Sequence, residues 1–482
     1  MLDSLLAKEE WRKYQLLKRL ERSPYFSLTK KEMMDQLEIS NFVLKSMIDQ
    51  LTLDIEKYEL AQEIHVFLED PFIQLEITGT ASSETLLEKY VEESISFQLL
   101  LGAVLGTYKS LNDFSEKVLI SYPIARKNYK QLNKYLASFN FKVDKKFRLI
   151  GDCEKNLRLF LTELFSRIYK ADFSIFTQKD KSFVQSRQVY LLMAGMTIHQ
   201  KNNLQQYLYI TDLRIQQQKY VEVQGKNFLL RESIQEEAGN SFFQRVPSDF
   251  REAEVIAFLR YYYSRSEDLA IGLKLAENEQ IIDWSQNLLA GLLHYFPKLT
   301  GYSEHKNVFL RRSYLLHFQL METSQAYEEL QPEMNILYFQ QTYPKVLAFC
   351  KKYINDSKDT DLGLFKKKKQ VLFHYLFLIL DSFPKKNLLE MIYIYVDFSF
   401  GSLYNKFIVE NLDFFHVAGA EVADELELSD IILTDSRDLG KKYKKDYVVW
   451  LAPPRPLDWA NLGQKISNTR ALKKVDSKNT GD

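Results

Sequence analysis

The sequence predicts a mainly α-helical, multidomain protein, and chain length, hydrophobic periodicity and composition all lead to this class. A chain of 482 residues is too long for one hydrophobic core. Apolar residues recur at helical spacing through most of the chain, and β-like runs are short. The 46% hydrophobic and 27% charged residues are ordinary for a globular protein. We place domains at residues 1–80, 81–153, 154–277, 278–386 and 387–466, followed by a polar tail over 467–482 that we expect to be disordered.

Two stretches near the N-terminus repeat one layout, in which a helix, a second helix, a tight turn, a third helix and a strand pair follow one another. In the first module we expect these elements at residues 11–20, 28–37, 38–40, 41–53, 64–67 and 72–78. In the second module we expect them at 95–108, 111–120, 121–123, 124–139, 141–143 and 147–150. This is the outline of a winged helix-turn-helix, and two in succession make double-stranded DNA the leading candidate for the partner.

The third helix of the second module has two faces. The residues expected to pack inward recur at steps of three and four, and they are Ala125, Tyr129, Leu132 and Leu136. The residues that we predict to contact DNA lie outward, in the preceding turn or in the wing, and they are Ser121, Arg126, Lys127, Lys130, Asn133, Lys134, Lys145 and Lys146. The alternative is a solvated basic helix in a bundle, but the turn and the following strand pair favour DNA.

The third helix of the first module gives a weaker functional signal. Its expected buried stripe is Leu44, Ile48, Leu51 and Ile55. The predicted DNA contacts are Ser40, which is also a good N-cap, together with Asn41, Lys45 and Ser46. This face also carries Asp49. It either reads bases while adding little affinity, or it orients the second module, and the sequence leaves both open.

Charge separates the two modules, although the whole chain has 64 basic and 64 acidic residues. Between Lys109 and Ile150, ten basic residues face three acidic ones, a local net charge of +7. Between Lys8 and Leu60, ten basic residues face ten acidic ones. We therefore predict that the second module is the stronger electrostatic anchor on DNA.

The segments 120–134, 139–143 and 149–152 resemble the second helix-turn-helix of the Mga/RofA-like family of stand-alone transcriptional regulators from Gram-positive cocci. Residues 2–20, followed by 31–34 and Leu44, resemble the first one, and the RofA-like branch is the most similar. The resemblance implies a DNA-binding transcriptional regulator of virulence or surface-protein genes. It also implies a homodimer or higher homo-oligomer and RNA polymerase as a partner.

The middle of the chain reads as successive helices, expected at 157–169, 185–199, 253–263, 281–295, 308–322, 334–354 and 365–383. Breaks near 267–277 and 301–305 suggest two helical bundles. The family resemblance implies two phosphotransferase-system regulation domains here, which dimerise, can carry phosphohistidine and would have a phosphocarrier as partner.

Five histidines in this region are candidate phosphorylation sites. His199 and His305 have polar neighbours, which favour exposure, and they are the better candidates. His294, His317 and His374 lie in apolar helices and are expected in the core. For any single histidine, a structural role is the better expectation.

After residue 386 the pattern changes to strands and helices. Strands are expected at 391–396, 414–418, 431–434 and 447–451, with a helix at 403–411, as in a small doubly wound α/β domain with a parallel sheet. It resembles a phosphotransferase-system IIB-like domain, but the loop 397–400 lacks that domain's nucleophilic cysteine. We therefore interpret it as a binding or oligomerisation unit.

No enzyme, cofactor or metal site is predicted. Cys153 and Cys350 are isolated and fit a reducing cytoplasm, and no apolar run reaches the roughly 20 residues that span a membrane. We expect a cytoplasmic protein with no membrane partner. Two other classes are the alternatives: a phosphotransferase-coupled enzyme or phosphocarrier, and a phosphotransferase-coupled, RNA-binding regulator of the antiterminator type. The RNA-binding class would need aromatic stacking positions on a sheet face or a basic RNA-binding segment.

Overall fold

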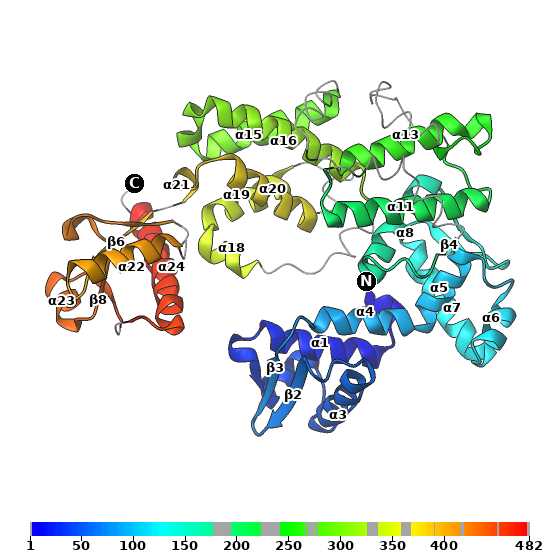
Figure 1. Ribbon diagram of the computed structural model, residues 1–482, viewed down its shortest axis with the longest axis horizontal. Helices are drawn as coiled ribbons and strands as arrows, with labels where there is room; N and C mark the ends of the chain where they lie inside the picture. Colours follow the sequence, from blue (N-terminus) through cyan, green and yellow to red (C-terminus); the bar gives the residue numbers. More distant parts are fainter. Residues whose placement is uncertain are drawn as a thin grey trace. The chain divides into compact units, whose positions relative to one another are not determined.

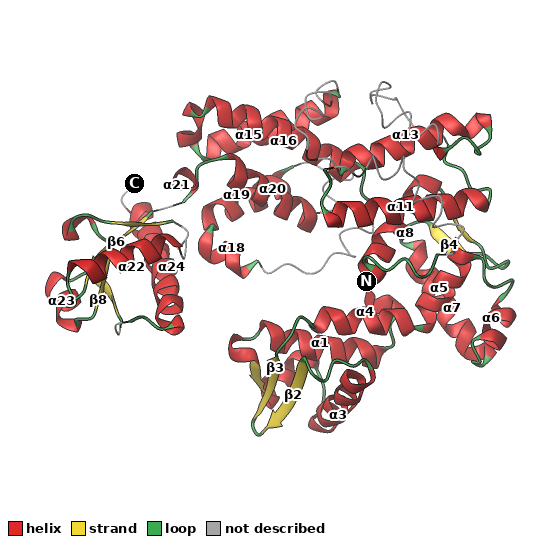
Figure 2. Ribbon diagram, viewed as in Figure 1, coloured by secondary structure: helices red, strands yellow, loops and turns green. Residues whose placement is uncertain are grey.

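The computed structural model describes residues 2–176, 193, 195–222, 242–265, 267, 275, 278–324, 336–357, 368–389, 391–414, 419–450 and 453–479. It divides into two compact units, one of Met1–Ser266 with Glu322–Glu333, the other of Glu267–Met321 with Met334–Asp482. Helices dominate both units, and strands are confined to three small sheets in the described residues (Figures 1 and 2). The prediction of a mainly helical, multidomain fold is therefore confirmed.

The first module consists of helices α1 (Lys8–Arg22), α2 (Lys30–Leu37) and α3 (Asn41–Lys57), followed by an antiparallel pair, β2 (Ile64–Glu69) and β3 (Phe72–Ile77). Thr29 and Glu32 form a capping box at the start of α2, and Glu38 ends that helix in the left-handed conformation. The helix predicted from residue 28 starts later, because Ser27–Thr29 form strand β1 on the edge of β3.

The second module consists of α5 (Ile95–Leu105), α6 (Leu111–Lys117) and α7 (Tyr122–Ala137), followed by the antiparallel pair β4 (Phe141–Val143) and β5 (Leu149–Gly151). Helix α6 ends three residues before the predicted position, and Leu119 adopts a left-handed conformation after it. The predicted turn 121–123 is partly wrong, because α7 already begins at Tyr122. Pro123 fits the first turn of a helix, where its missing amide hydrogen is not needed.

Helix α4 (Ser83–Glu93), which the sequence analysis did not predict, joins the modules. Its Glu84 accepts a hydrogen bond of 2.8 Å from the Tyr14 hydroxyl of α1 and also pairs with Arg167 of α8. The Tyr90 hydroxyl donates to Asp54 of α3. Side chains of α4 therefore bond to α1 and α3 of the first module and to α8, which follows the second module, so α4 is a fixed connection rather than a loose linker.

The chain start also connects the modules. The short 3₁₀ helix η1 (Leu2–Leu5) packs on α7, with Leu2 and Leu5 buried. The Gln131 side-chain amide of α7 donates a hydrogen bond of 2.7 Å to the Ser4 carbonyl. These first residues therefore pack on the second module, although they precede the first one in sequence.

The first unit continues with α8 (Glu154–Tyr169), α11 (Ile198–Gln216) and α13 (Ser248–Ser264). The predicted helix 185–199 lies outside the described residues except near its end. His199 belongs to the first turn of α11 and does not end a helix as predicted.

The second unit begins with a helical bundle. It contains α15 (Glu279–Tyr295), the 3₁₀ helix η3 (Pro297–Gly301), α16 (Ser303–Met321), α18 (Leu337–Thr342), α19 (Pro344–Asp356), α20 (Lys368–Ser382) and α21 (Lys385–Leu388). The helix predicted over 334–354 is interrupted before Pro344, which starts a new helix. The predicted break at 301–305 covers the end of η3 and the first residues of α16, and α15 and α16 pack against each other in one bundle.

A small α/β domain completes the second unit. Its strands are β6 (Ile392–Asp397), β7 (Ala420–Val422), β8 (Ile431–Thr434) and β9 (Asp446–Val449), and its helices are α22 (Ser402–Phe414), the 3₁₀ helix η5 (Leu426–Leu428), α23 (Arg437–Tyr443) and α24 (Pro456–Asn479). The strand order is β7-β6-β8-β9, and all pairs are parallel as predicted. Of the strand predicted at 414–418, Phe414 ends α22 and the rest lies outside the described residues.

The prediction of a disordered tail from residue 467 is wrong, because α24 continues to Asn479. Polar side chains of this helix bond to the domain rather than to solvent alone. The Thr469 hydroxyl donates to Asp446 at 2.9 Å, and the Arg470 guanidinium donates to the Gly419 carbonyl at 3.1 Å. Polarity alone therefore misled the prediction, because these polar groups have fixed partners.

Candidate nucleic-acid interface

The inward face of α7 is formed as predicted. Ala125, Leu132 and Leu136 are buried, and Tyr129 is half-buried. The Tyr129 hydroxyl donates a hydrogen bond of 2.6 Å to the Val143 carbonyl in β4. This face therefore fixes α7 against the other helices and against the strand pair.

The outward face of α7 is a basic surface. Arg126, Lys127, Lys130 and Lys134 are exposed. At about 100° per residue, these four positions fall in a sector of about 100° opposite the buried stripe. Within the described residues, none of the four forms an ion pair. Their charges are therefore available to an anionic partner.

Asn133 does not fit the prediction of an outward contact. Its Oδ1 accepts a hydrogen bond of 2.8 Å from the Val143 amide, and its Nδ2 donates to the Val143 carbonyl at 3.2 Å. Helix geometry gives the reason, because Asn133 is displaced by about 20° from Arg126 toward the buried stripe. It positions the wing strand on the helix.

The wing turn between β4 and β5 is organised by Asp144. The amides of Lys146 and Arg148 each donate to its Oδ1 at 2.9 Å, and the Arg148 guanidinium pairs with its Oδ2. Burial alone would raise the pKa of Asp144, but the bonds from Arg148 and the amides outweigh it and hold the pKa below its usual value. Phe147 of this turn is buried, and its ring stacks on Phe114 with 5.9 Å between the ring centroids.

This arrangement leaves three wing cations exposed, Lys142, Lys145 and Lys146, whereas Arg148 is neutralised by Asp144. Ser121 is exposed at the N-cap of α7, and its hydroxyl makes no capping hydrogen bond. The exposed cations of helix and wing thus belong to one module, on the two elements that a winged helix applies to DNA.

Helix α3 of the first module repeats α7 in register, with Ser40 at the position of Ser121. Its predicted inward stripe, Leu44, Ile48, Leu51 and Ile55, is buried. The Ser40 hydroxyl accepts from the Val43 amide at 3.4 Å, as predicted for an N-cap. Asn41, Lys45 and Ser46 are exposed as predicted. Phe42, in the first turn of α3, is 82% exposed.

The candidate phosphorylation sites differ in exposure. His199 is exposed in the first turn of α11, whereas His305 is half-buried with its ring edge-on to Tyr302 at 5.3 Å. His294 is exposed, which corrects the expectation of a core residue.

His317 is buried as predicted and is held through both ring nitrogens. Its Nδ1 lies 2.7 Å from the Ser285 hydroxyl, and its Nε2 lies 2.9 Å from the Tyr375 hydroxyl. Burial lowers the pKa of His317 to about 3, so this ring is neutral at pH 7.

Residues 79–165 match the family model described as the Mga helix-turn-helix domain. The chain therefore contains an Mga helix-turn-helix domain. The matched residues contain α4, the whole second module and most of α8, so the basic surface belongs to the Mga helix-turn-helix domain. The chain has no significant match among curated proteins. In the described part of the chain, no helix combines the length and the apolar character needed to cross a membrane.

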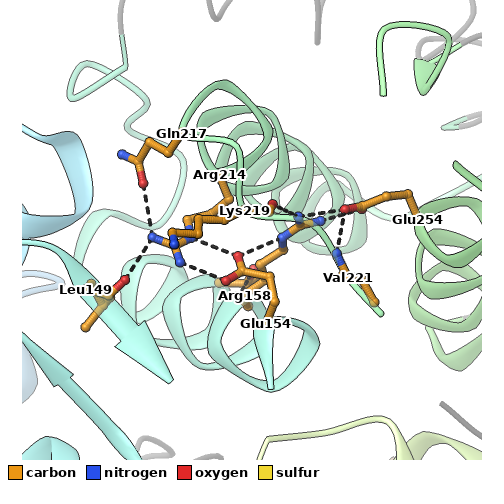
Figure 3. A network of polar contacts seen from close by, with 9 residues as sticks. Leu149, Glu154, Arg158, Arg214, Gln217, Lys219, Val221 and Glu254 are labelled. Carbon is orange, nitrogen blue, oxygen red and sulfur yellow. Dashed lines mark hydrogen bonds and ion pairs between the residues drawn. The ribbon is translucent and has the colours of Figure 1, made fainter. Parts of the chain in front are cut away.

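A buried ion-pair network joins the Mga helix-turn-helix domain to α11 and α13 (Figure 3). Arg158 of α8 pairs with Glu254 at 2.6 Å, and Arg214 of α11 pairs with Glu154 at 2.7 Å and donates to the Leu149 carbonyl in β5 at 3.2 Å. Burial disfavours the charge of Arg158, but Glu254 more than compensates and raises its pKa. The wing strand β5 and helices α8, α11 and α13 are therefore joined by buried charged groups. Removal of either member of an ion pair would leave the other member buried without a partner.

Proposed function

We propose that this protein is an Mga-family, DNA-binding transcriptional regulator whose second module supplies most of the affinity for duplex DNA. The observation that carries the proposal is the set of exposed, unpaired cations on α7 and on the wing of one helix-turn-helix domain. In this docking mode the third helix enters the major groove and the wing touches the neighbouring backbone. The contacts that we propose are Ser121, Arg126, Lys127, Lys130 and Lys134, with Lys145 and Lys146 in the wing.

The test is to replace Arg126, Lys127 and Lys130 by Ala in the full chain and to measure binding to duplex DNA across a salt series. We expect binding to weaken strongly and the slope of log affinity against log salt to flatten by roughly three, because each lost phosphate contact removes about 0.9. A matched control replaces Lys385, Lys386 and Lys406, three exposed lysines of the other unit, with the same change in net charge. Loss of affinity with an unchanged slope would contradict phosphate contact by these residues.

The finer assignments follow from the resemblance, and we include them in the proposal. They are membership of the RofA-like branch, control of virulence or surface-protein genes, a cytoplasmic location, contact with RNA polymerase and assembly into a homodimer or higher homo-oligomer. Two copies would engage two half-sites and gain affinity by avidity. Sedimentation of the full chain tests the assembly, and a monomer at micromolar concentration would contradict it.

We propose that a phosphotransferase-system phosphocarrier tunes the protein at His199 or His305. The exposure of His199 supports it as the better site, because a phosphoryl donor must reach the ring. Phosphorylation adds about two negative charges and would shift the DNA-competent population. The test incubates the chain with the general phosphotransferase components and phosphoenolpyruvate and locates the label by mass spectrometry. Absence of label, with normal regulation by His199→Ala and His305→Ala proteins, would contradict this part.

One observation favours the alternative, an RNA-binding regulator of the antiterminator type. The outward face of the first-module sheet presents His65, Phe67 and Phe72, and aromatic side chains on a sheet face can stack on unpaired bases. However, Glu76 lies opposite His65 and Glu69 lies opposite Phe72 on the paired strands, and acidic neighbours repel a phosphate backbone. A competition binding experiment with duplex DNA and a hairpin RNA distinguishes the DNA-binding regulator from the RNA-binding one. Preferential binding of the RNA would support the alternative.

A further inference from the structure

The strand pair β4–β5 is held at both of its edges. Val143 of β4 lies opposite Leu149 of β5. Both backbone groups of Val143 bond to α7, because its amide donates to Asn133 and its carbonyl accepts from Asn133 and Tyr129. In an antiparallel pair, opposite residues that do not exchange hydrogen bonds direct their backbone groups away from the partner strand. The Leu149 carbonyl therefore points away from β4, to the outer edge of β5.

The partner of this carbonyl is Arg214, in the last turn of α11 (Figure 3). Its Nη1 donates to the Leu149 carbonyl at 3.2 Å and to Gln217 Oε1 at 3.0 Å. Its Nε and Nη2 donate to the two carboxylate oxygens of Glu154 at 2.8 and 2.7 Å. A buried, planar guanidinium with partners on three sides has a fixed orientation. The edge of β5 is therefore bound to a helix that lies outside the matched residues 79–165.

The end of α11 binds a second carbonyl of the same module. Gln217 directly follows the last residue of α11, and its Nε2 donates to the Val104 carbonyl of α5 at 2.7 Å. Carbonyls in the last turn of a helix have no partner within that helix, so Gln217 supplies a bond that α5 cannot make itself. Because Gln217 also accepts from Arg214, the contacts to α5 and to β5 are linked.

The end of α11 is itself anchored by two other helices. Arg158 of α8 donates to the Lys219 carbonyl at 2.8 Å, and Glu254 of α13 accepts from the Val221 amide at 2.9 Å. The side chains of Arg158 and Glu254 pair with each other. Arg214 therefore holds the edge of β5 from a fixed base.

We infer that Arg214 is a positioning residue for the DNA-binding surface, because it holds β5 so that the wing cations Lys145 and Lys146 stay beside α7. Leu149 directly follows the wing turn, so the position of its carbonyl determines where the turn lies. A two-stranded pair is at best marginally stable by itself, and α7 binds only the edge of β4. This inference rests on the proposed function and adds to it a residue outside the helix-turn-helix domain that controls the wing.

The first test is Arg214→Lys in the full chain. Lysine keeps the charge beside Glu154, but its single ammonium group cannot span Glu154 and Leu149 as the planar guanidinium does. We expect the slope of log affinity for duplex DNA against log salt to flatten by roughly two, because two wing contacts of about 0.9 each are lost. Replacing both Lys145 and Lys146 by Ala should flatten it equally. Adding Arg214→Lys to that wing variant should change nothing further, because the contacts that it controls are already absent.

Amide hydrogen exchange tests the positioning role without DNA. The Asp144 amide bonds to the Arg148 carbonyl, and the Arg148 amide bonds to Asp144 Oδ1, both at 2.9 Å. In Arg214→Lys we expect both amides to exchange about tenfold faster, since a hydrogen bond from a charged donor no longer holds the strand. Gln217→Ala should give a smaller increase in the same direction, and it carries the test if Arg214→Lys does not fold.

The matched control is Arg260→Lys. It makes the same change in an arginine of α13 whose ion pair with Glu322 does not involve the second module. We expect the salt slope and the exchange of the wing amides to remain those of the unchanged protein. Circular dichroism first establishes that each variant keeps its helical content.

The outcomes distinguish this inference from the proposed function. Wing amides that exchange at the unchanged rate in Arg214→Lys and Gln217→Ala, or that exchange equally fast in Arg260→Lys, would overturn the positioning role. A loss of affinity that adds to that of the wing variant would also overturn it. If the wing variant kept the unchanged affinity and salt slope, the wing contacts of the proposed function would be contradicted, and amide exchange would still decide whether Arg214 positions the wing.

Discussion

Helices α3 and α7 place the same kinds of residue inward and different kinds outward. Apolar or half-buried residues occupy the four inward positions of both helices. The outward positions pair Lys45 with Arg126, Ser46 with Lys127, Asp49 with Lys130, and Leu53 with Lys134. Packing constrains the inward positions, whereas the outward ones are free to vary without cost to the fold. The third helices of the two modules therefore differ in outward charge and not in inward packing, and we propose that this charge gives them different affinities for DNA.

The wings differ in the same direction. The first-module wing turns at Glu69 and Asp70, and Asp70 pairs with Lys30 at 3.1 Å. The second-module wing exposes Lys145 and Lys146, while its Asp144 is occupied by backbone amides and Arg148. An acidic tip repels phosphates and a basic tip attracts them. The basic helix and basic wing of the second module thus agree, which supports our proposal that this module is the DNA anchor.

The largest effect is expected when α7 receives the outward residues of α3. The variant Arg126→Lys, Lys127→Ser, Lys130→Asp and Lys134→Leu removes three cations and adds one anion, while the inward stripe stays unchanged. We expect DNA affinity to fall more than about a hundredfold, because three charged contacts are lost, and the helical content to stay the same. Fluorescence anisotropy and circular dichroism measure the two quantities. Retained affinity would show that the outward face of α7 is not the anchor.

The reciprocal exchange should give a smaller gain. Lys45→Arg, Ser46→Lys, Asp49→Lys and Leu53→Lys place the α7 pattern on α3. We expect affinity for duplex DNA to rise about tenfold with a steeper salt slope, provided that α3 faces DNA. An unchanged affinity would instead indicate that the first module orients the second and does not touch DNA. This result would decide between the two roles that the sequence leaves open.

The comparison also shows what the sequence can and cannot predict. The inward stripes were predictable, because Leu44 through Ile55 and Ala125 through Leu136 follow the helical period. The bonding of Asn133 to Val143 was not, because it depends on where a strand packs. Helix α4 and the position of η1 on α7 depend on tertiary bonds, such as that between Gln131 and Ser4, which no local pattern contains.

A smaller effect is expected at Asn133, and it concerns stability rather than affinity for phosphates. Asn133→Ala removes both hydrogen bonds to Val143, so we expect unfolding free energy to fall by about 1 kcal/mol. The equivalent residue of α3 is Thr52, an exposed side chain whose hydroxyl bonds only to the Ile48 carbonyl of its own helix. Thr52→Ala should therefore change stability by less than about 0.5 kcal/mol. Chemical denaturation measures both variants, and equal effects would contradict the wing-positioning role.

The smallest effect is expected from acid. In each module a carboxylate fixes a turn by accepting hydrogen bonds from backbone amides. Asp144 accepts from the amides of Lys146 and Arg148, and Glu63 accepts from the amide of Ala81 at 2.8 Å. Burial raises the pKa of Asp144, but the bonds from Arg148 and the amides outweigh burial, so the net pKa lies below its usual value. The amides of Ala81 and Thr80 lower the pKa of Glu63. Because the folded-state pKa is depressed in both cases, this stabilisation is complete above the unfolded-state values of about 4 and is lost as pH falls through the folded-state values.

Amide NMR shifts report on this titration directly. Between pH 7 and 5 we expect constant shifts for the amides of Lys146, Arg148 and Ala81, and below about pH 4 we expect each amide to move with its own carboxylate. The stability that Asp144 contributes is less than about 1 kcal/mol, because its ion pair with Arg148 is partly exposed to water. Asp144→Asn should remove the acid response of Lys146 and Arg148 and leave that of Ala81. If Asp144→Asn also removed the acid response of the Ala81 amide, the two turns would be coupled. The conformation of the wing would then depend on the first module.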